Sequence, residues 1–157
     1  MQQYVLGFAF SGDQVALILK ARPAWQAGRL NGVGGKVEPG EQAQAAMARE
    51  FREETGVDTD AAEWLLFAVM NGPGFEVVCF RSELAAERFE QLQSCTDEQV
   101  VAMPLDNPSI TKFGLSNVPW LLAAARDPDC GRMVLNVQYG GPGEDLASER
   151  LLALAAA

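Results

Sequence analysis

The chain is 157 residues long, with 48% hydrophobic and 21% charged residues, a composition typical of one globular domain with its own core. Its net charge of −9 and a pI near 4.4 argue against a general binder of nucleic acids or anionic membranes, because both partners select basic surface. The absence of histidine excludes Ser-His and Cys-His catalysis, and three cysteines without a CxxC pair indicate neither a disulfide framework nor a structural zinc site.

The chain is predicted to open with a β-hairpin. Residues 4–10 and 15–20 have strand-forming composition and are separated by Ser11-Gly12-Asp13, which is a turn sequence. Residues 21–29 contain proline and glycine and are predicted to be a loop. Residues 30–33 are then predicted to form a short strand that runs into two glycines.

The next element is a helix with an acidic edge. It begins after Pro39-Gly40 and ends at Gly56, and its apolar residues recur at helical spacing: Ala43, Ala46, Met47 and Phe51. Glu50, Glu53 and Glu54 fall within about one third of its circumference and repel one another there. A bound Mg²⁺ or Mn²⁺ would offset that repulsion, since both ions prefer carboxylate oxygens. A solvated acidic face is the alternative explanation for three glutamates alone.

Strands and helices alternate over the rest of the chain. In chain order we predict a hairpin of residues 63–70 and 75–81 around Asn71-Gly72-Pro73-Gly74, a loop with a short helix over 82–94, a strand over 99–103, a turn over 104–108 and a helix over 118–126. Residues 127–157 form a C-terminal appendage, with a strand over 133–139 and a helix over 144–157. This appendage closes the sheet, covers the active site or forms a homodimer, and the three alternatives stay open.

The spacing around the acidic helix is more specific than its composition. Gly35 is followed after five residues by Glu41, after seven more by Arg49-Glu50-Phe51, and then by Glu53-Glu54 and Gly56-Val57. This resembles the Nudix box, G-x5-E-x7-R-E-U-x-E-E-x-G-U with U apolar, at every specified position. The resemblance implies an α/β fold, the α/β/α sandwich with a mixed β-sheet of the Nudix family, with residues 1–157 as a single Nudix hydrolase domain.

The resemblance also implies a mechanism and a set of site residues. Nudix hydrolases use a divalent metal, Mg²⁺ here with Mn²⁺ as the alternative, to promote attack of water on a diphosphate joined to another moiety X. By position in the box, Glu50, Glu53 and Glu54 resemble the residues that bind metal or act as base, and Arg49 resembles the residue that orients them. Glu41 resembles the glutamate that supports the metal shell. Two positions outside that pattern complete the set, the backbone carbonyl of Gly34 as a further ligand and Glu98 as an acidic ligand or base from a later loop.

Substrate binding is expected outside the box. Four basic residues cluster just before it or at its start, and they are candidate phosphate contacts or solvated surface residues: Lys20, Arg22, Arg29 and Lys36. Lys36 follows glycines but is not followed by Ser or Thr, so the Walker motif is absent. Asn117, before Val118-Pro119-Trp120-Leu121, resembles the residue that meets a purine edge in the bacterial 8-oxo-dGTP diphosphatases, although an N-cap is the alternative. Trp25 and Phe113 either stack on a base or pack in the core.

These observations predict a Mg²⁺-dependent hydrolase of a nucleoside diphosphate linked to X, with a purine (deoxy)nucleoside triphosphate, oxidised forms included, as the favoured substrate. The alternatives are hydrolysis of ADP-ribose, a dinucleotide or an RNA 5′ end, and a catalytically silent nucleotide sensor. No run approaches the roughly 20 apolar residues of a membrane span, and the N-terminus lacks a basic leader. We therefore expect a cytoplasmic protein whose partner is a small nucleotide, with no nucleic-acid or membrane partner.

Overall fold

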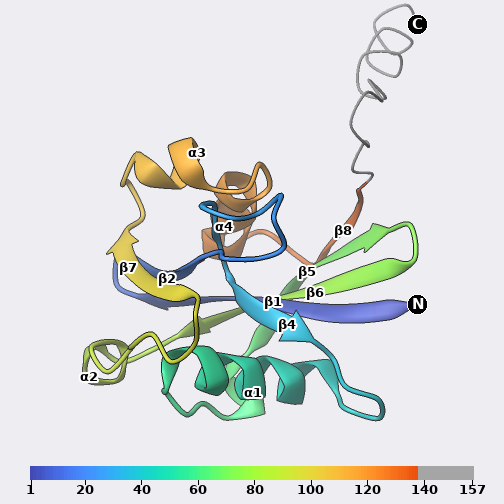
Figure 1. Ribbon diagram of the computed structural model, residues 1–157, viewed down its shortest axis with the longest axis horizontal. Coiled ribbons are helices and arrows are strands. Elements are labelled where there is room, and N and C mark those ends of the chain that lie inside the picture. Colours follow the sequence, from blue (N-terminus) through green and yellow to red (C-terminus); the bar gives the residue numbers. More distant parts are fainter. Residues whose placement is uncertain (138–157) are drawn as a thin grey trace, which may run out of the picture.

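An eight-stranded mixed β-sheet organises residues 1–137, the part of the chain that this computed structural model describes (Figure 1). Six strands follow one another in the order β3-β2-β1-β6-β5-β8, while β4 pairs with β1 and β7 pairs with β2. The strands are β1 (Gln2–Ser11), β2 (Gln14–Leu19), β3 (Leu30–Asn31), β4 (Val33–Lys36), β5 (Leu65–Gly72), β6 (Phe75–Glu83), β7 (Gln99–Pro104) and β8 (Met133–Asn136).

The strand β1 lies at the centre of the sheet and contributes to two hydrophobic cores. It runs antiparallel to β2 and β4 and parallel to β6. Because successive side chains of a strand point to opposite faces, Leu6 and Phe8 enter one core while Val5 and Ala9 enter the other. The sheet is therefore covered on both sides.

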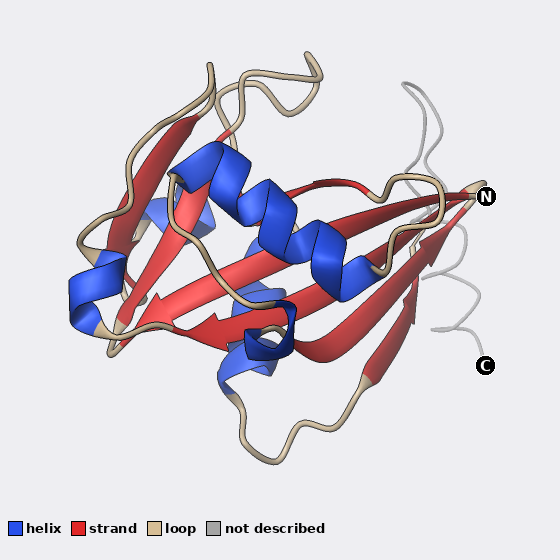
Figure 2. Cartoon of the chain, turned by 90° about the horizontal axis from the view of Figure 1, so that it is seen from below, coloured by secondary structure: helices blue, strands red, loops and turns tan. Residues whose placement is uncertain are grey.

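Helices supply the two outer layers. The helix α1 (Ala43–Thr55) covers one face of the sheet, as Figure 2 shows, and α3 (Ser109–Phe113) and α4 (Val118–Arg126) lie on the opposite side (Figure 1). The short helix α2 (Ala86–Phe89) follows β6, and a 3₁₀ turn, Ala61–Glu63, precedes β5. This arrangement confirms the predicted α/β/α sandwich with a mixed sheet.

The helix α1 forms because one stripe of its surface is apolar. Met47 and Phe51 are fully buried, and the Phe51 ring meets the Trp64 ring edge-on at a centroid distance of 5.1 Å. Each such side chain contributes about 1.5–3 kcal/mol by leaving water. Gly56 ends the helix in the left-handed conformation, with φ of 74°, and its N–H donates to Arg52 O. Burial of this stripe fixes the rotation of α1 about its axis. It therefore determines which glutamates face β4.

One predicted element differs from the structure near the start of the box. The single strand predicted over residues 30–33 is two strands, because the chain changes partners at Gly32: β3 pairs with β2 and β4 pairs with β1. The two glycines that follow the predicted strand, Gly34 and Gly35, lie inside β4. A Cβ on Gly34 would collide with the carbonyl oxygen of Val5 on β1, so a glycine lets the two strands approach.

Several later predictions are confirmed and others need correction. Both hairpins and the helix over 118–126 are present, and the short helix in 82–94 is α2. The strand β5 begins at Leu65, not at residue 63, because the Asp60 and Glu63 capping box closes a 3₁₀ turn before it. The helix α3 was not predicted.

The first part of the C-terminal appendage joins the sheet. The strand β8 runs parallel to β5, and Val137 N–H donates to Asn71 O at 2.8 Å. Of the predicted strand over 133–139, β8 ends at Asn136, and Tyr139 and the predicted helix over 144–157 lie outside the described residues. Within residues 1–137, no helix is long and apolar enough to cross a bilayer.

Candidate active site

The acidic edge of α1 is organised by one guanidinium group. Arg49 donates from Nε and Nη2 to both carboxylate oxygens of Glu41, at 2.9 and 3.0 Å, and from Nη1 to Glu50 at 2.9 Å and Glu53 at 3.4 Å. Its Nη2 also donates to Lys36 O at 2.9 Å, which ties α1 to the end of β4. The hydrogen bond from Arg49 is the main cause that lowers the pKa of Glu41. Arg49 thus holds three glutamates of the predicted set and the strand before them.

Two carboxylates of the edge, Glu50 and Glu54, are partly buried. Burial raises the pKa of Glu50, against the opposing effect of Arg49, and the carboxylate lies against the backbone of Gly35. Burial raises the pKa of Glu54 to about 7, with Lys20 opposing the shift and Glu98 adding to it. Glu54 Oε2 is buried and has no hydrogen-bond partner among residues 1–137. Glu54 therefore carries an unmet demand for positive charge, whereas Glu50 is paired with Arg49.

The donor atoms fit a hard divalent cation in their chemistry. The predicted ligands are carboxylate oxygens of Glu41, Glu50, Glu53 and Glu54 and the carbonyl oxygen of Gly34, and such oxygens suit Mg²⁺ or Mn²⁺. The buried, unpartnered Glu54 Oε2 is the structural observation that favours a cation there. In the described part of the chain no three His, Cys, Asp or Glu side chains are arranged as a metal cluster, and three of these carboxylates are bound by Arg49.

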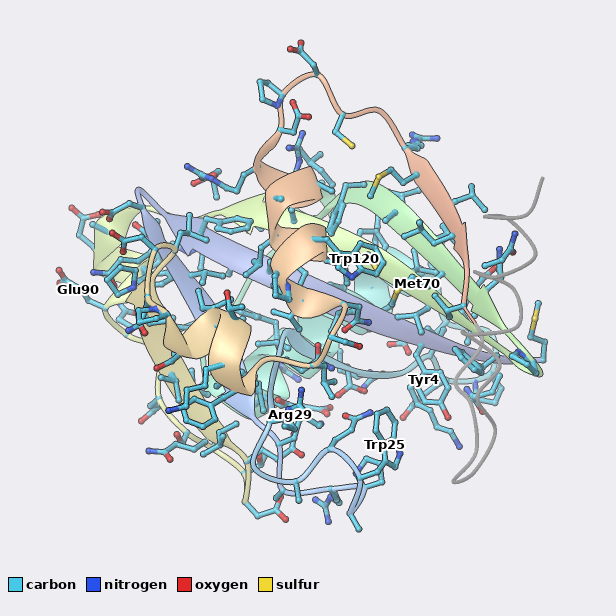
Figure 3. The ribbon with its side chains drawn as sticks, turned by 90° about the horizontal axis from the view of Figure 1, so that it is seen from above. Tyr4, Trp25, Arg29, Met70, Glu90 and Trp120 are labelled. Carbon is cyan, nitrogen blue, oxygen red and sulfur yellow. The ribbon has the colours of Figure 1, made fainter. Side chains whose placement is uncertain are left out.

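A cleft of about 450 Å³ adjoins the acidic edge. Gly34 and Gly35 of β4 belong to its lining, so it borders the backbone that contacts Glu50. Aromatic and apolar side chains form most of the remaining wall, and Figure 3 labels three of them: Tyr4, Trp25 and Met70. Its volume and lining are typical of a site for a small organic ligand.

Asn117 is the polar side chain that distinguishes this cleft. It is 9% exposed and lines the cleft, and its Nδ2 donates to Met70 Sδ at 3.7 Å. Its Oδ1 is buried with no hydrogen-bond partner among residues 1–137. Asn117 occupies the N-cap position of α4, but its side chain makes no capping hydrogen bond there. An acceptor in this state is available to a ligand that donates a hydrogen bond.

The four predicted basic residues do not gather around the cleft. Lys20 lines it and pairs with Glu98 at 2.7 Å, whereas Arg22 pairs with Asp97 at 2.9 Å on the surface. Arg29 donates to the carbonyl oxygens of Phe113 and Gly114, and the Lys36 side chain is exposed. Only Lys20 of the four belongs to the cleft lining.

Sequence reasoning missed much of the cleft wall. Tyr4 on β1 and Phe75 on β6 are both lining residues, and the parallel pairing of these strands brings them together. Asn31 also lines the cleft, and its Oδ1 accepts the Gly32 N–H at 2.9 Å. Its place four residues before the start of the box was a signal that it lies close to the site. Trp25 does line the cleft, at 61% exposure, while Phe113 is not among the lining residues.

Comparison with known proteins connects this site to a family. A family model described as the NUDIX domain matches residues 2–121, which is most of the chain. The chain belongs to the Nudix family. The match spans the strand β4, the helix α1 and the start of α4, and it confirms the resemblance seen in the box. The protein is accordingly a Nudix pyrophosphohydrolase, a class that generally uses divalent metals such as Mg²⁺.

Curated relatives of this Nudix protein act on different substrates. A CTP pyrophosphohydrolase of Escherichia coli (strain K12) is 31% identical over 125 residues, covering 72% of this chain and 88% of that protein. An NAD-capped RNA hydrolase, NudC, of Stutzerimonas stutzeri (strain A1501) is 29% identical over 112 residues, covering 71% of this chain but 36% of the longer relative.

Solved structures show the same fold at low identity. A MutT protein from Bacillus halodurans superposes with a TM-score of 0.66 at 18% identity, covering 88% of this chain and 91% of that one. A NUDIX hydrolase from Nitrosomonas europaea gives a TM-score of 0.62 at 16% identity, covering 87% and 79%. The Nudix fold of this chain is therefore shared well beyond the box.

Proposed function

We propose that this Nudix hydrolase cleaves a nucleoside diphosphate linked to X, with a purine (deoxy)nucleoside triphosphate, oxidised forms included, as its substrate. The observation that carries the proposal is the buried Asn117 carboxamide in a cleft that adjoins the box. A carboxamide offers a donor and an acceptor, and its unpartnered Oδ1 suits an N–H on the edge of a base. The base lies in the cleft and the phosphates reach toward α1.

The chemistry belongs to the acidic edge of α1. Glu50, Glu53 and Glu54, with Glu41 and the Gly34 carbonyl, are the groups that would hold the metal. A bound Mg²⁺ offsets phosphate charge and makes a coordinated water more acidic. Arg49 sets the direction of Glu41, Glu50 and Glu53 through its hydrogen bonds. Glu50, next to the cleft-lining Gly35, is our candidate for the carboxylate that takes the proton of the attacking water, while Lys20 is the candidate phosphate contact.

Two further substrates are favoured by the relatives. The CTP pyrophosphohydrolase suggests cytidine triphosphate, whose exocyclic amino group would also donate to Asn117 Oδ1. The NAD-capped RNA hydrolase keeps a dinucleotide or an RNA 5′ end as the other alternative. The expectation that nucleic acid is not a partner therefore stays a prediction. A silent sensor is not favoured, because all four box glutamates are present.

The deciding experiment is a substrate screen with the purified full chain and Mg²⁺. Triphosphates of guanine, 8-oxoguanine, adenine and cytosine are compared with ADP-ribose and NAD-capped RNA, and released pyrophosphate, phosphate or nucleoside monophosphate is measured. We expect the highest kcat/KM for a purine triphosphate. A higher value for CTP would replace that substrate with the first alternative, and turnover confined to capped RNA or ADP-ribose would contradict the proposal.

The role of the box is tested with Glu53→Gln, which removes one charge and keeps the shape of the side chain. We expect kcat to fall by about 10² or more while the thermal midpoint changes little, because Glu53 is half exposed and its contact with Arg49 is long. Glu87→Gln, an exposed glutamate on α2, is the matched control and should keep wild-type turnover. Equal turnover of the two variants would refute the proposed use of the box.

A further inference from the structure

One wall of the cleft is a loop that is closed at its base. Residues 21–29 join β2 to β3, and Pro23, Trp25 and Gln26 from this loop line the cleft. Lys20 N–H donates to Arg29 O at 2.8 Å and Gly28 N–H donates to Lys20 O at 2.9 Å, so the two ends of the loop are joined. At the far end, Arg29 holds the carbonyl oxygens of Phe113 and Gly114. The two ends of the loop are therefore tied to each other, and its last residue is also tied to the segment before α4.

Glu98 provides the support at the first turn. Its Oε2 accepts the Lys20 ammonium at 2.7 Å, and its Oε1 accepts the backbone N–H groups of Ala21 at 3.1 Å and Arg22 at 3.4 Å. The residue is 4% exposed and lies directly before β7, whose Gln99 pairs with Leu19 of β2. A buried carboxylate with one cation and two amide donors is a well-satisfied group, and removing it leaves all three donors without their acceptor.

The same contacts argue against a role for Glu98 in proton transfer or as a ligand. Both oxygens are engaged by protein donors, and the residue is not among those that line the cleft. These donors would have to be displaced before Glu98 could bind a metal ion or take a proton from water.

We propose that Glu98 is a positioning residue: its carboxylate fixes the first turn of the 21–29 loop and the direction of Lys20, and so sets the wall of the cleft that carries Trp25. The identity of the ligand that this wall binds, a nucleoside triphosphate, rests on the proposed function. It differs from the expectation that Glu98 acts as a metal ligand or base.

Steady-state kinetics with dGTP and with CTP, in Mg²⁺, separate the two roles. For Glu98→Gln we expect KM to rise about tenfold and kcat to stay within about threefold of wild type, because substrate binding is impaired and chemistry is not. Lys20→Met should give the same pattern. The double variant should be no worse than the poorer single one, since both act through one contact. A fall in kcat of about 10²–10⁴ at unchanged KM in Glu98→Gln alone, as for loss of a general base, would overturn the proposal.

Amide hydrogen exchange tests the support without any substrate. In Glu98→Ala the amides of Ala21 and Arg22 should exchange at least about tenfold faster than in wild type, and Glu87→Gln should leave them unchanged. Unchanged protection in Glu98→Ala would also overturn the proposal. If that variant does not fold, the kinetics of Glu98→Gln and its double variant with Lys20 decide. If neither dGTP nor CTP is hydrolysed, the proposed function fails, but the exchange result still tests whether Glu98 supports the loop.

Discussion

At the scale of single residues, Arg49 has more partners than any lysine can satisfy. Its Nε and Nη2 both donate to Glu41, Nη2 also donates to Lys36 O, and Nη1 donates to Glu50. Arg49→Lys keeps the charge but loses this geometry, so we expect a loss of about 1–3 kcal/mol in the free energy of unfolding and a fall in kcat of about tenfold or more. Urea unfolding and initial rates measure the two effects.

The neighbouring Arg52 is the control for that prediction. Its side chain is exposed and its nearest ion pair, with Asp58, is 3.9 Å long. Arg52→Lys should therefore change stability by less than about 0.5 kcal/mol and leave kcat as it is. If the two lysine variants behave alike, the hydrogen-bond network of Arg49 does not organise the site.

A substitution at Asn117 tests whether this side chain selects the base of the substrate or stabilises the start of α4. Since its side chain makes no cap hydrogen bond, Asn117→Ala should reduce discrimination between purine bases by about tenfold or more and cost little stability. Asn107→Ala is the opposite case, because Asn107 Oδ1 accepts the Ser109 N–H at 2.9 Å where α3 begins. That variant should lose about 1 kcal/mol and keep wild-type discrimination. Ratios of kcat/KM for dGTP and dATP, with thermal unfolding, give both quantities.

At the scale of secondary-structure elements, the close approach of β4 predicts different outcomes for two adjacent glycines. A Cβ on Gly35 would collide with the Glu50 carboxylate, which is the end of a flexible side chain and can move. Gly35→Ala should therefore lower kcat by about tenfold or more with little loss of stability. A Cβ on Gly34 would collide with the backbone of Val5, so Gly34→Ala should cost about 2 kcal/mol or more. Reversed effects on kcat and unfolding would contradict this account of β4.

Elements whose signals are local in sequence were predicted well. The helix α1 carries an apolar stripe and a glycine stop, and α4 has Pro119 in its first turn, so sequence alone placed both helices. Five residues are too few to show helical periodicity, which explains why α3 was missed. The split of residues 30–33 depends on two different pairing partners, β2 and β1, and such pairing leaves no local signal.

The candidate site, like the fold, has one part that sequence predicts and another part that it does not. The box was predicted because its spacing lies within one continuous stretch of sequence, from Gly35 at the end of β4 through α1 to Val57. Its cleft was not, because Tyr4 and Phe75 are far apart in sequence and meet through the parallel pairing of β1 with β6. Arg29 does not line the cleft because it binds carbonyl oxygens of residues 84 and 85 positions later in the chain, a contact that sequence does not reveal. Lys36 does not line it either, and its side chain is exposed.

At the scale of the whole molecule, burial of Cys79 links stability to alkaline pH. Burial raises the pKa of the Cys79 thiol to about 12, while a thiol in the unfolded chain ionises near 8.5 or so. The unfolded state therefore loses its proton first, and the contribution of Cys79 to stability is complete below that lower value and is lost as pH rises toward 12. The excess stability of wild type over Cys79→Ala should shrink by about 2–3 kcal/mol between about pH 8 and about pH 10.5.

Urea unfolding followed by tryptophan fluorescence measures this difference at the two pH values. Comparison with the variant removes the contribution that the titration of lysines and tyrosines makes to the pH dependence, because both proteins share those residues. A difference that does not change with pH would show that Cys79 ionises in the folded state as easily as in the unfolded one.

The parallel pairing of β1 with β6 also has a consequence for how the chain reaches its native state. Each β1 residue from Gln2 to Phe10 meets a β6 partner 73 residues further on, as Gln2 meets Phe75. The central strand is made first during synthesis and must wait for β6 before either core can close. Pairing over such a separation carries a high loop-closure cost and slows folding. We expect the β1–β2 hairpin and α1 to form early, and the β1–β6 pairing, which brings the walls of the cleft together, to form in the step that limits folding.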